Sequence, residues 1–246
     1  MMRAPLSTGK FGWVNKWLLS VHDWLLPPCC VLCGRAGSNG MDLCSSCASE
    51  LPYIGSACKQ CAIPLSRGAV CGACQKRAPG FSDAKAVFLY QEPIDFLVRA
   101  LKFDQKLYCA RLLGELMAEV LVCELADDDL PDVILPVPLH PVRLRQRGFN
   151  QALELARPIS RRLGVPLAPA VCKRKINTDP QTGMDSTARR RNLKGVFEVS
   201  VDSGMSHIAI VDDVMTTGST VEALAQALKA AGVGRVSVWV CARSDI

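Results

Sequence analysis

The chain has 246 residues, of which 49% are hydrophobic and 21% are charged, and its formal net charge is +6. This apolar content is enough for a buried core and excludes an intrinsically disordered protein. We find no run of about 18 apolar residues, so the sequence predicts no membrane span.

The first segment, residues 1–27, carries Trp13, Trp17, Val21 and Trp24 at helical spacing. This spacing predicts an amphipathic helix, and docking on its own protein is favoured over a membrane-surface or partner role. Polar residues interrupt the apolar ones and no small-residue cleavage site follows, so a secretory signal is not indicated. We therefore expect a cytoplasmic protein.

Residues 28–78 hold most of the cysteines, arranged as four Cys-x-x-Cys pairs separated by ten, ten and nine residues. Two such pairs supply four thiolates, which complete a tetrahedral Zn²⁺ shell. The segment therefore predicts a double zinc ribbon with two structural zinc sites, because so short a stretch needs metal to fold. The predicted ligands are Cys30, Cys33, Cys44, Cys47, Cys58, Cys61, Cys71 and Cys74.

Other interpretations of these cysteines are weaker. Disulfides are disfavoured by the paired spacing and the missing export signal, and four redox-active pairs in one segment would be unusual. Spacing alone leaves open which pairs share a zinc ion, although consecutive pairing closes the shorter loops. Cys29 competes with Cys30 for the first ligand position.

From residue 80 to residue 246, strand and helix patterns alternate. The expected strands span 84–90, 133–139, 207–213 and 235–243, and the expected helices span 94–103, 108–125, 150–164 and 219–232. This alternation predicts an α/β domain built on a mainly parallel sheet flanked by helices. Ligands of such folds bind at the carboxyl ends of the strands.

Two adjacent carboxylates, Asp212 and Asp213, end one of these strands, and a hydroxyl-rich turn follows them. The helix N-terminus after the turn offers N–H groups and positive dipole to a phosphate, and Gly218 lets the backbone approach closely. The carboxylates can accept hydrogen bonds from a diol. Phosphate and diol together describe a ribose 5-phosphate. A plain helix cap with solvated carboxylates is the alternative, but the complete array favours a binding site.

The segment AIVDDVMTTGST resembles the phosphoribosyl pyrophosphate (PRPP) motif of type I phosphoribosyltransferases. Together with LPVPLHPVRLRQRGFNQALELA, NTDPQTGMDSTARRRNLKGVF and the zinc-ribbon segment, it resembles the ComF/ComFC family, which is associated with DNA uptake in natural competence. The resemblance extends from about Leu25 to the end of the chain. It implies a type I phosphoribosyltransferase-like fold and displacement of pyrophosphate from Mg²⁺-bound PRPP.

The resemblance also implies roles for individual residues. Asp212 and Asp213 would take the ribose 2′- and 3′-hydroxyls. The 5′-phosphate would be held by Thr216, Thr217, Gly218, Ser219 and Thr220. Candidates for pyrophosphate and for the loop that covers PRPP are Arg143, Arg147, Asn150, Gln151, Thr178, Gln181, Arg189 and Asn192. No residue stands out as a general base.

The acceptor of the phosphoribosyl group is not indicated, and two hypotheses remain. The first is a phosphoribosyltransferase that uses Mg²⁺–PRPP in nucleic-acid handling. The second is a non-catalytic module that keeps a PRPP-like pocket and binds single-stranded DNA or a competence-machinery protein. Basic runs at 143–147, 173–175 and 189–194 favour an anionic partner in either case.

Overall fold

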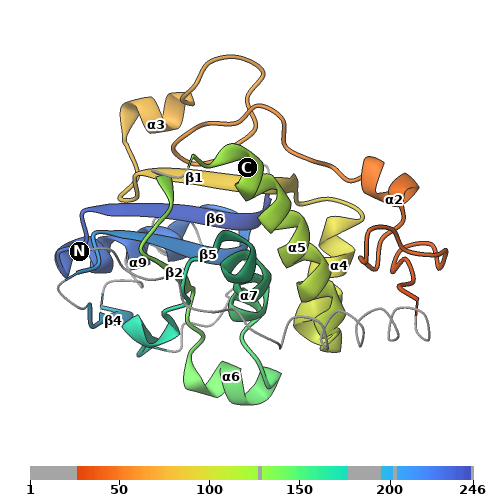
Figure 1. Ribbon diagram of the computed structural model, residues 1–246. Coiled ribbons are helices and arrows are strands. Elements are labelled where there is room, and N and C mark those ends of the chain that lie inside the picture. The colour runs from red at the N-terminus through yellow and green to blue at the C-terminus, as the bar shows by residue number, and fades with distance from the viewer. Residues whose placement is uncertain (1–26, 127–128, 177–194, 202–203, 245–246) are drawn as a thin grey trace, which may run out of the picture. The chain divides into compact units, whose positions relative to one another are not determined.

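The computed structural model describes residues 27–126, 129–176, 195–201 and 204–244 (Figure 1). The chain divides into two compact units, Met1–Leu51 and Pro52–Ile246. The helix expected in residues 1–27 lies almost wholly outside the described residues. The expected boundaries of the ribbon segment (28–78) and of the α/β domain (80–246) stay predictions. Among the described helices, none combines the length and the hydropathy needed to cross a membrane.

The described part of the first unit is held by tight turns around its cysteines. The N–H of Cys30 donates to the carbonyl of Arg35 at 2.7 Å, and the N–H of Gly34 donates back to the carbonyl of Cys30 at 2.9 Å. Helix α2 (Ser45–Ser49) is a single short turn that begins directly after Cys44. Apart from cysteines, the only buried apolar side chains among the described residues of this unit are Leu43 and Leu51, so the unit depends on its cysteines for stability.

The second unit is built on a parallel sheet of four strands in the order β1-β6-β5-β2. These strands are β1 (Asp83–Leu89), β2 (Val133–Pro136), β5 (His207–Met215) and β6 (Arg235–Arg243). Central strands β5 and β6 are buried along almost their whole length, as is typical of parallel strands covered on both faces. The structure confirms the predicted α/β fold with a parallel sheet.

Helices cover both faces of this sheet (Figure 1). The helices are α4 (Ile94–Asp104), α5 (Leu107–Glu124), α7 (Gln151–Leu163) and α9 (Ser219–Ala230). Ile208 and Ile210 of β5 share a core with Leu224 and Leu228 of α9. The residues between them point to the opposite face because side chains alternate along a strand. On that face α7 packs against β5, β2 and α5.

Helix α7 contains Pro158 yet runs unbroken from Gln151 to Leu163. The ring of Pro158 lies so close to α5 that a Cβ on Gly114 would come within 2.9 Å of it. A side chain at residue 114 would also come within 2.7 Å of the Leu155 carbonyl oxygen. Pro158 therefore lies where α5 and α7 cross closely.

Shorter elements complete the unit. They are α3 (Gly72–Lys76), α6 (Pro141–Arg147), the 3₁₀ turn η2 (Pro169–Val171) and an antiparallel pair formed by β3 (Cys172–Arg174) and β4 (Phe197–Val199). Helix α6 was not expected. Three residues mark its ends in the sequence. The ring of His140 accepts a hydrogen bond from the N–H of Val142 as an N-cap, and Pro141 lies in the first turn. Gly148 ends the helix in the left-handed region.

Residues 52–78 belong to this second unit and line the outer edge of its sheet. The N–H of Ile54 donates to the carbonyl of Val87 at 2.9 Å, and the N–H of Leu89 donates to the carbonyl of Pro52 at the same distance. Ala62 is buried in the core shared with α9. The second half of the cysteine-rich segment is therefore part of the α/β unit.

Candidate functional site

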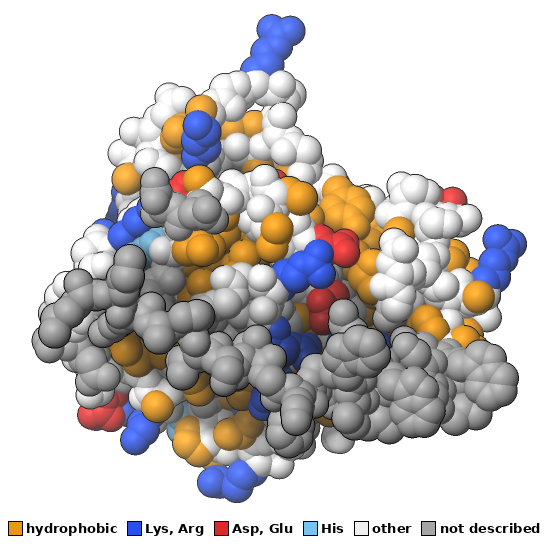
Figure 2. Space-filling view, in the orientation of Figure 1, with side chains coloured by type: hydrophobic (Ala, Val, Ile, Leu, Met, Phe, Trp, Pro, Cys, Tyr) orange, Lys and Arg blue, Asp and Glu red, His pale blue; other side chains and the backbone are white. Residues whose placement is uncertain are grey.

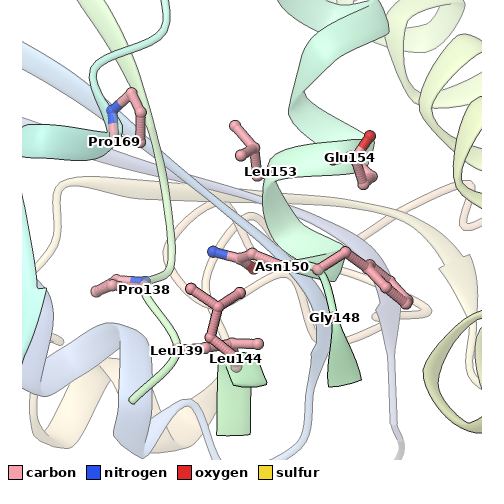
Figure 3. A pocket seen from close by; sticks show the side chains of 9 residues that line it. Pro138, Leu139, Leu144, Gly148, Asn150, Leu153, Glu154 and Pro169 are labelled. Atoms are coloured by element: carbon pink, nitrogen blue, oxygen red, sulfur yellow. The ribbon is translucent and has the colours of Figure 1, made fainter. Parts of the chain in front are cut away.

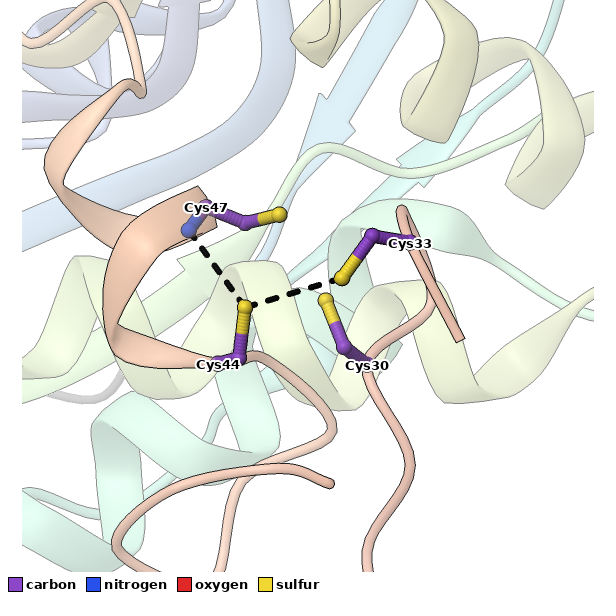
Figure 4. A group of neighbouring side chains, drawn as sticks. All are labelled: Cys30, Cys33, Cys44 and Cys47. Atoms are coloured by element: carbon purple, nitrogen blue, oxygen red, sulfur yellow. Dashed lines mark hydrogen bonds between the residues drawn. The ribbon is translucent and has the colours of Figure 1, made fainter. Parts of the chain in front are cut away.

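The eight predicted zinc ligands come together in two groups of four. The groups are Cys30, Cys33, Cys44 and Cys47 (Figure 4), and Cys58, Cys61, Cys71 and Cys74, with all sulfurs of a group within 4.8 Å of one another. The Cys33 and Cys44 sulfurs are 3.6 Å apart, and those of Cys61 and Cys71 are 3.7 Å apart. A tetrahedral zinc ion with bonds of about 2.3 Å would separate its sulfurs by about 3.8 Å. Both groups therefore fit Zn²⁺, and the pairing is consecutive.

Cys29, the competitor for the first ligand position, lies outside both groups. Its thiol is exposed and donates to the carbonyl of Gly34 at 3.1 Å. Cys30 is buried and takes its place in the first group. The choice of Cys30, which rests on the two-residue spacer, agrees with this placement.

The thiols within each group oppose one another's ionisation. Burial works against the thiolate of Cys30, but backbone N–H groups, that of Cys44 foremost, lower its pKa to about 6. Cys58 behaves alike, with a pKa of about 7. In contrast, contacts with the other thiols raise the pKa of Cys47. A divalent cation would relieve this mutual opposition and hold all four sulfurs as thiolates.

Metal analysis of the purified full chain is expected to give about two zinc ions per molecule. Removal of the metal by a strong chelator should release both ions and loosen both cysteine groups, because neither buries much apolar surface of its own. Inductively coupled plasma mass spectrometry gives the ratio, and thiol titration of the unfolded protein provides the control. A ratio near zero with eight cysteines found in disulfides would contradict the zinc sites.

The predicted phosphate loop lies between β5 and α9. Strand β5 runs through both carboxylates to Met215, and α9 begins at Ser219. Gly218 between them has a φ of +74°, a conformation that other residues adopt only with strain. The hydroxyl of Thr217 donates to the hydroxyl of Ser219 at 3.1 Å. The turn thus presents hydroxyls and the N-terminal N–H groups of a twelve-residue helix, which suits an anion.

The two carboxylates differ in their surroundings. Asp213 is buried and forms an ion pair with Lys102 of α4. One carboxylate oxygen of Asp212 accepts the N–H of Asp213 at 2.9 Å. Burial, together with the negative charge of Asp213, raises the pKa of Asp212 well above its ordinary value. Lys102 was not predicted as a site residue, because nothing in its own helix distinguishes it from a surface lysine.

Two predicted arginines, Arg143 and Arg147, lie in α6. The N–H of Val137, just after β2, donates to the carbonyl of Val211, so the chain enters α6 beside Asp212. Arg143 and Arg147 are half-buried. Burial and the charge of Arg143 lower the pKa of Arg147, whereas the charge of Asp213 raises it. The negative charge of Asp213 therefore acts on Arg147, and Arg143 is a neighbouring positive charge.

Asn150 and Gln151 of the RGFNQ segment form hydrogen bonds within the protein. Gln151 accepts a hydrogen bond from Arg147 at 2.5 Å, which fixes the guanidinium. Asn150 caps α7, since its side-chain oxygen accepts the N–H of Ala152, and its side-chain amide donates to the carbonyl of Val137 at 3.0 Å. Both residues therefore hold the loop that carries Arg147, and their predicted role toward pyrophosphate stays a prediction.

Arg174 is a further basic residue of this region that the residue-by-residue prediction omitted. It is half-buried at the end of β3, between exposed Lys173 and Lys175, and its guanidinium lies 5.7 Å from the ring centre of Phe197. Burial and the charge of Arg143 lower its pKa, and the charge of Asp212 raises it. Arg147 of α6 is thus influenced by the charge of Asp213, and Arg174 of β3 by the charge of Asp212.

A pocket of about 400 Å³ lies next to this loop, between α6, the start of α7 and η2 (Figure 3). Its lining is mostly apolar, with Asn150 and Glu154 as the polar side chains, and consists of Pro138, Leu139, Leu144, Gly148, Phe149, Asn150, Leu153, Glu154 and Pro169. Such a lining suits contact with an apolar or aromatic group better than with an anion.

Thr178, Gln181, Arg189 and Asn192 lie outside the described residues, so their predicted role in covering PRPP stays a prediction.

Comparison with known proteins adds the family. A double zinc ribbon domain matches residues 21–75, and a phosphoribosyl transferase domain matches residues 150–244. The chain is 34% identical over 217 residues to Competence protein F of Haemophilus influenzae, covering 82% of this chain and 90% of that protein. The chain belongs to the ComF family. This ComF-family chain is also 34% identical over 223 residues to DNA utilization protein YhgH of Salmonella typhimurium, covering 89% and 98% of the two chains.

A third relative is more distant. Competence protein ComFC of Bacillus subtilis is 28% identical over 215 residues, covering 82% of this chain and 84% of that protein. The match to the phosphoribosyl transferase domain, with the parallel sheet described above, confirms the predicted phosphoribosyltransferase-like fold of this ComF protein. The two cysteine groups confirm its double zinc ribbon.

Proposed function

We propose that this ComF-family protein binds PRPP as its Mg²⁺ complex and transfers the phosphoribosyl group during DNA uptake or related DNA handling. The observation that carries this proposal is the carboxylate pair Asp212–Asp213 followed by the Thr216–Thr220 loop at the start of α9. Its two relatives named for competence and its relative named for DNA utilization support the biological setting. A reducing cytoplasm would keep the cluster thiols available for zinc.

Each part of the site would take one part of the substrate. The loop would hold the 5′-phosphate with N–H groups and hydroxyls, and Asp212 and Asp213 would accept hydrogen bonds from the ribose hydroxyls. Arg147 and Arg174 interact electrostatically with the carboxylates and with neighbouring Arg143, and the positive charge of these three arginines would balance the pyrophosphate. Mg²⁺ would arrive with PRPP and neutralise further negative charge.

These residues would act by positioning and by electrostatics. As pyrophosphate leaves, C1′ gains positive charge and the leaving oxygens gain negative charge. Fixed guanidinium groups stabilise the leaving group, and the anionic Asp212–Asp213 pair on the ribose side stabilises the positive centre. Gln151 holds Arg147 in place, so little reorganisation is needed at the moment of transfer.

Asp212→Asn is expected to weaken binding of Mg²⁺–PRPP by about 10- to 100-fold, since a charge-assisted hydrogen bond to the ribose is lost. Isothermal titration calorimetry measures this change. The folded-state pKa of Asp212 is raised, so its ionisation opposes folding as pH rises above the ordinary value of 3.8. Asp212→Asn should therefore be at least as stable as the parent at pH 7, and this advantage should vanish near pH 3.

This stability comparison ensures that lost binding is not mistaken for unfolding. Asp95→Asn is a suitable control, because Asp95 is paired with Arg99 on the surface of α4. Equal binding of PRPP by the parent and by Asp212→Asn would contradict the proposed site.

A non-catalytic DNA-binding role is the second candidate, and the exposed Lys173 and Lys175 beside Arg174 favour it. On the face shown in Figure 2, lysine and arginine side chains appear in several separate places. The consecutive basic side chains of residues 173–175 could contact successive phosphates of a single strand. If the parent bound single-stranded oligonucleotides but gave no heat with PRPP, this second role would replace the first. A competence-machinery protein is the further partner that the family membership suggests.

A further inference from the structure

Arg243 is a buried arginine that reaches two parts of the second unit at once. It is the last residue of β6 and is 3% exposed. One guanidinium nitrogen, Nη1, donates to the carbonyl oxygens of Met215 and Thr216, where the phosphate loop begins. Its Nε donates to the carbonyl of Cys61 at 3.1 Å. The same side chain therefore contacts the phosphate loop and a member of the second cysteine group.

We propose that Arg243 is a positioning residue through which the second zinc cluster sets the geometry of the phosphate loop. The link between cluster and loop stands on these hydrogen bonds alone. Its consequence for PRPP rests on the function proposed above.

The first step runs from metal to main chain. Cys61 is a member of the second cysteine group through its sulfur, and its backbone carbonyl accepts a hydrogen bond from Arg243. A zinc ion held by four thiolates would fix the position of this residue. Without the metal, the segment has only a few buried apolar side chains to hold it, so the Cys61 carbonyl would move more freely.

The second step runs from Arg243 to the loop. A buried guanidinium is costly unless its N–H groups are hydrogen-bonded, and its planar fork fixes the directions in which acceptors must lie. If the Cys61 carbonyl is displaced, the guanidinium must turn or lose a partner, and either change disturbs its bonds to Met215 and Thr216. The N–H of Ser244 also donates to the carbonyl of Met215 at 3.1 Å, which makes this end of β6 the support of the loop.

Coupling of this kind is reciprocal. A phosphate-bearing ligand that orders the loop should therefore strengthen the binding of zinc by the second cluster. Loss of that zinc should in turn loosen the loop by a similar free energy.

The test compares full-length, zinc-loaded variants by hydrogen–deuterium exchange from milliseconds to minutes, without PRPP. Cys71→Ser removes one ligand of the second group and is expected to speed exchange in residues 215–222 about fivefold, the lower end of common coupling strengths. Arg243→Lys keeps the charge but loses the fork, and should speed the same exchange. In the double variant the two effects should fall clearly short of additive. A merely structural arginine would give additive effects.

Two matched controls separate this link from general loosening. Cys33→Ser removes the corresponding kind of ligand from the first group, and no hydrogen bond described above joins that group to Arg243. Arg235→Ala alters the other end of β6, where Arg235 pairs with Asp83 and Asp129. Both should leave the exchange of residues 215–222 unchanged.

Because Cys71→Ser could impair folding, a second measurement uses the unaltered chain. Part of the zinc is removed with a chelator and measured with a coloured zinc indicator. Hydrogen–deuterium exchange of residues 58–74 then shows whether the released zinc came from the second cluster. PRPP or inorganic phosphate should reduce the amount of zinc released from the second cluster at a fixed chelator concentration in the parent and not in Arg243→Lys. Additive variant effects, or loop exchange that ignores the second cluster, would overturn the inference. A responsive loop in a protein that does not bind PRPP would leave the link intact and refute only the proposed function.

Discussion

Lys102→Met is expected to lower the free energy of unfolding by about 3 kcal/mol at pH 7. The Lys102 side chain is 22% exposed and its partner Asp213 is 5% exposed, so the pair is largely removed from water. Methionine keeps the apolar stem but leaves a buried carboxylate beside a second one at Asp212. Urea unfolding followed by circular dichroism measures the loss.

The sign of the pH dependence follows from the lysine. Burial is the largest single influence and lowers the pKa of Lys102, but the charge and hydrogen bond of Asp213 and the charge of Asp212 together raise it above 10.5. The contribution of the pair is therefore fully present below pH 10.5 and is lost as pH rises through the folded-state pKa. At pH 7 the whole difference between parent and variant should be visible.

Two further variants identify the cause. Lys102→Met/Asp213→Asn should recover most of the lost stability, because it removes the uncompensated charge. Lys85→Met breaks the exposed pair between Lys85 and Glu124 and should cost less than about 1 kcal/mol. Similar losses for Lys102→Met and Lys85→Met would show that burial of the pair is unimportant.

Gly114→Val is expected to cost about 3 kcal/mol or to prevent folding. A Cβ at residue 114 would lie 2.7 Å from the Leu155 carbonyl oxygen and 2.9 Å from the Pro158 ring. Neither neighbour can move aside easily, since one is backbone and the other is a ring within α7. Thermal unfolding of the variant gives the size of the effect.

The smaller substitution Gly114→Ala separates crowding from helix preference. Alanine favours a helix over glycine by about 1 kcal/mol, so a net loss in Gly114→Ala must come from the contact with α7. Gly72 opens α3 with no atom within 4 Å of its Cβ position, and Gly72→Ala should be close to neutral. Unchanged or increased stability of Gly114→Ala would show that the helices can separate without cost.

Features encoded by local spacing were predictable from the sequence. The even spacing of the Cys-x-x-Cys pairs predicted two groups of four sulfurs, and the structure brings these sulfurs together. Strand β6 spans the predicted residues 235–243, because its apolar residues, interrupted only by Ser237, are bounded by Arg235 and Arg243. The turn from Asp213 to Ser219 was likewise visible in its hydroxyl and glycine residues.

Features that depend on contacts distant in sequence were not predictable. Lys102 lies in helix α4, and its partner Asp213 is far from it in the sequence. Arg243 ends a buried strand, where its binding to the Cys61 carbonyl has no local signal. Arg174 looked like one member of a solvated basic run until the pairing of β3 with β4 half-buried it. In each case tertiary packing, and not periodicity, decides the role.

The lining of β1 by residues 52–54 bears on how the protein can be divided. Strand β1 is one of the two edge strands of the sheet, and Ile54 and Leu89 take part in the hydrogen bonds that cover it. A shortened protein that starts at residue 80 would leave those backbone groups without hydrogen-bond partners. An exposed sheet edge of this kind pairs with other chains and leads to aggregation. Removal of residues 1–51 follows the boundary between the two units. The cysteine-rich segment therefore cannot be treated as one detachable module.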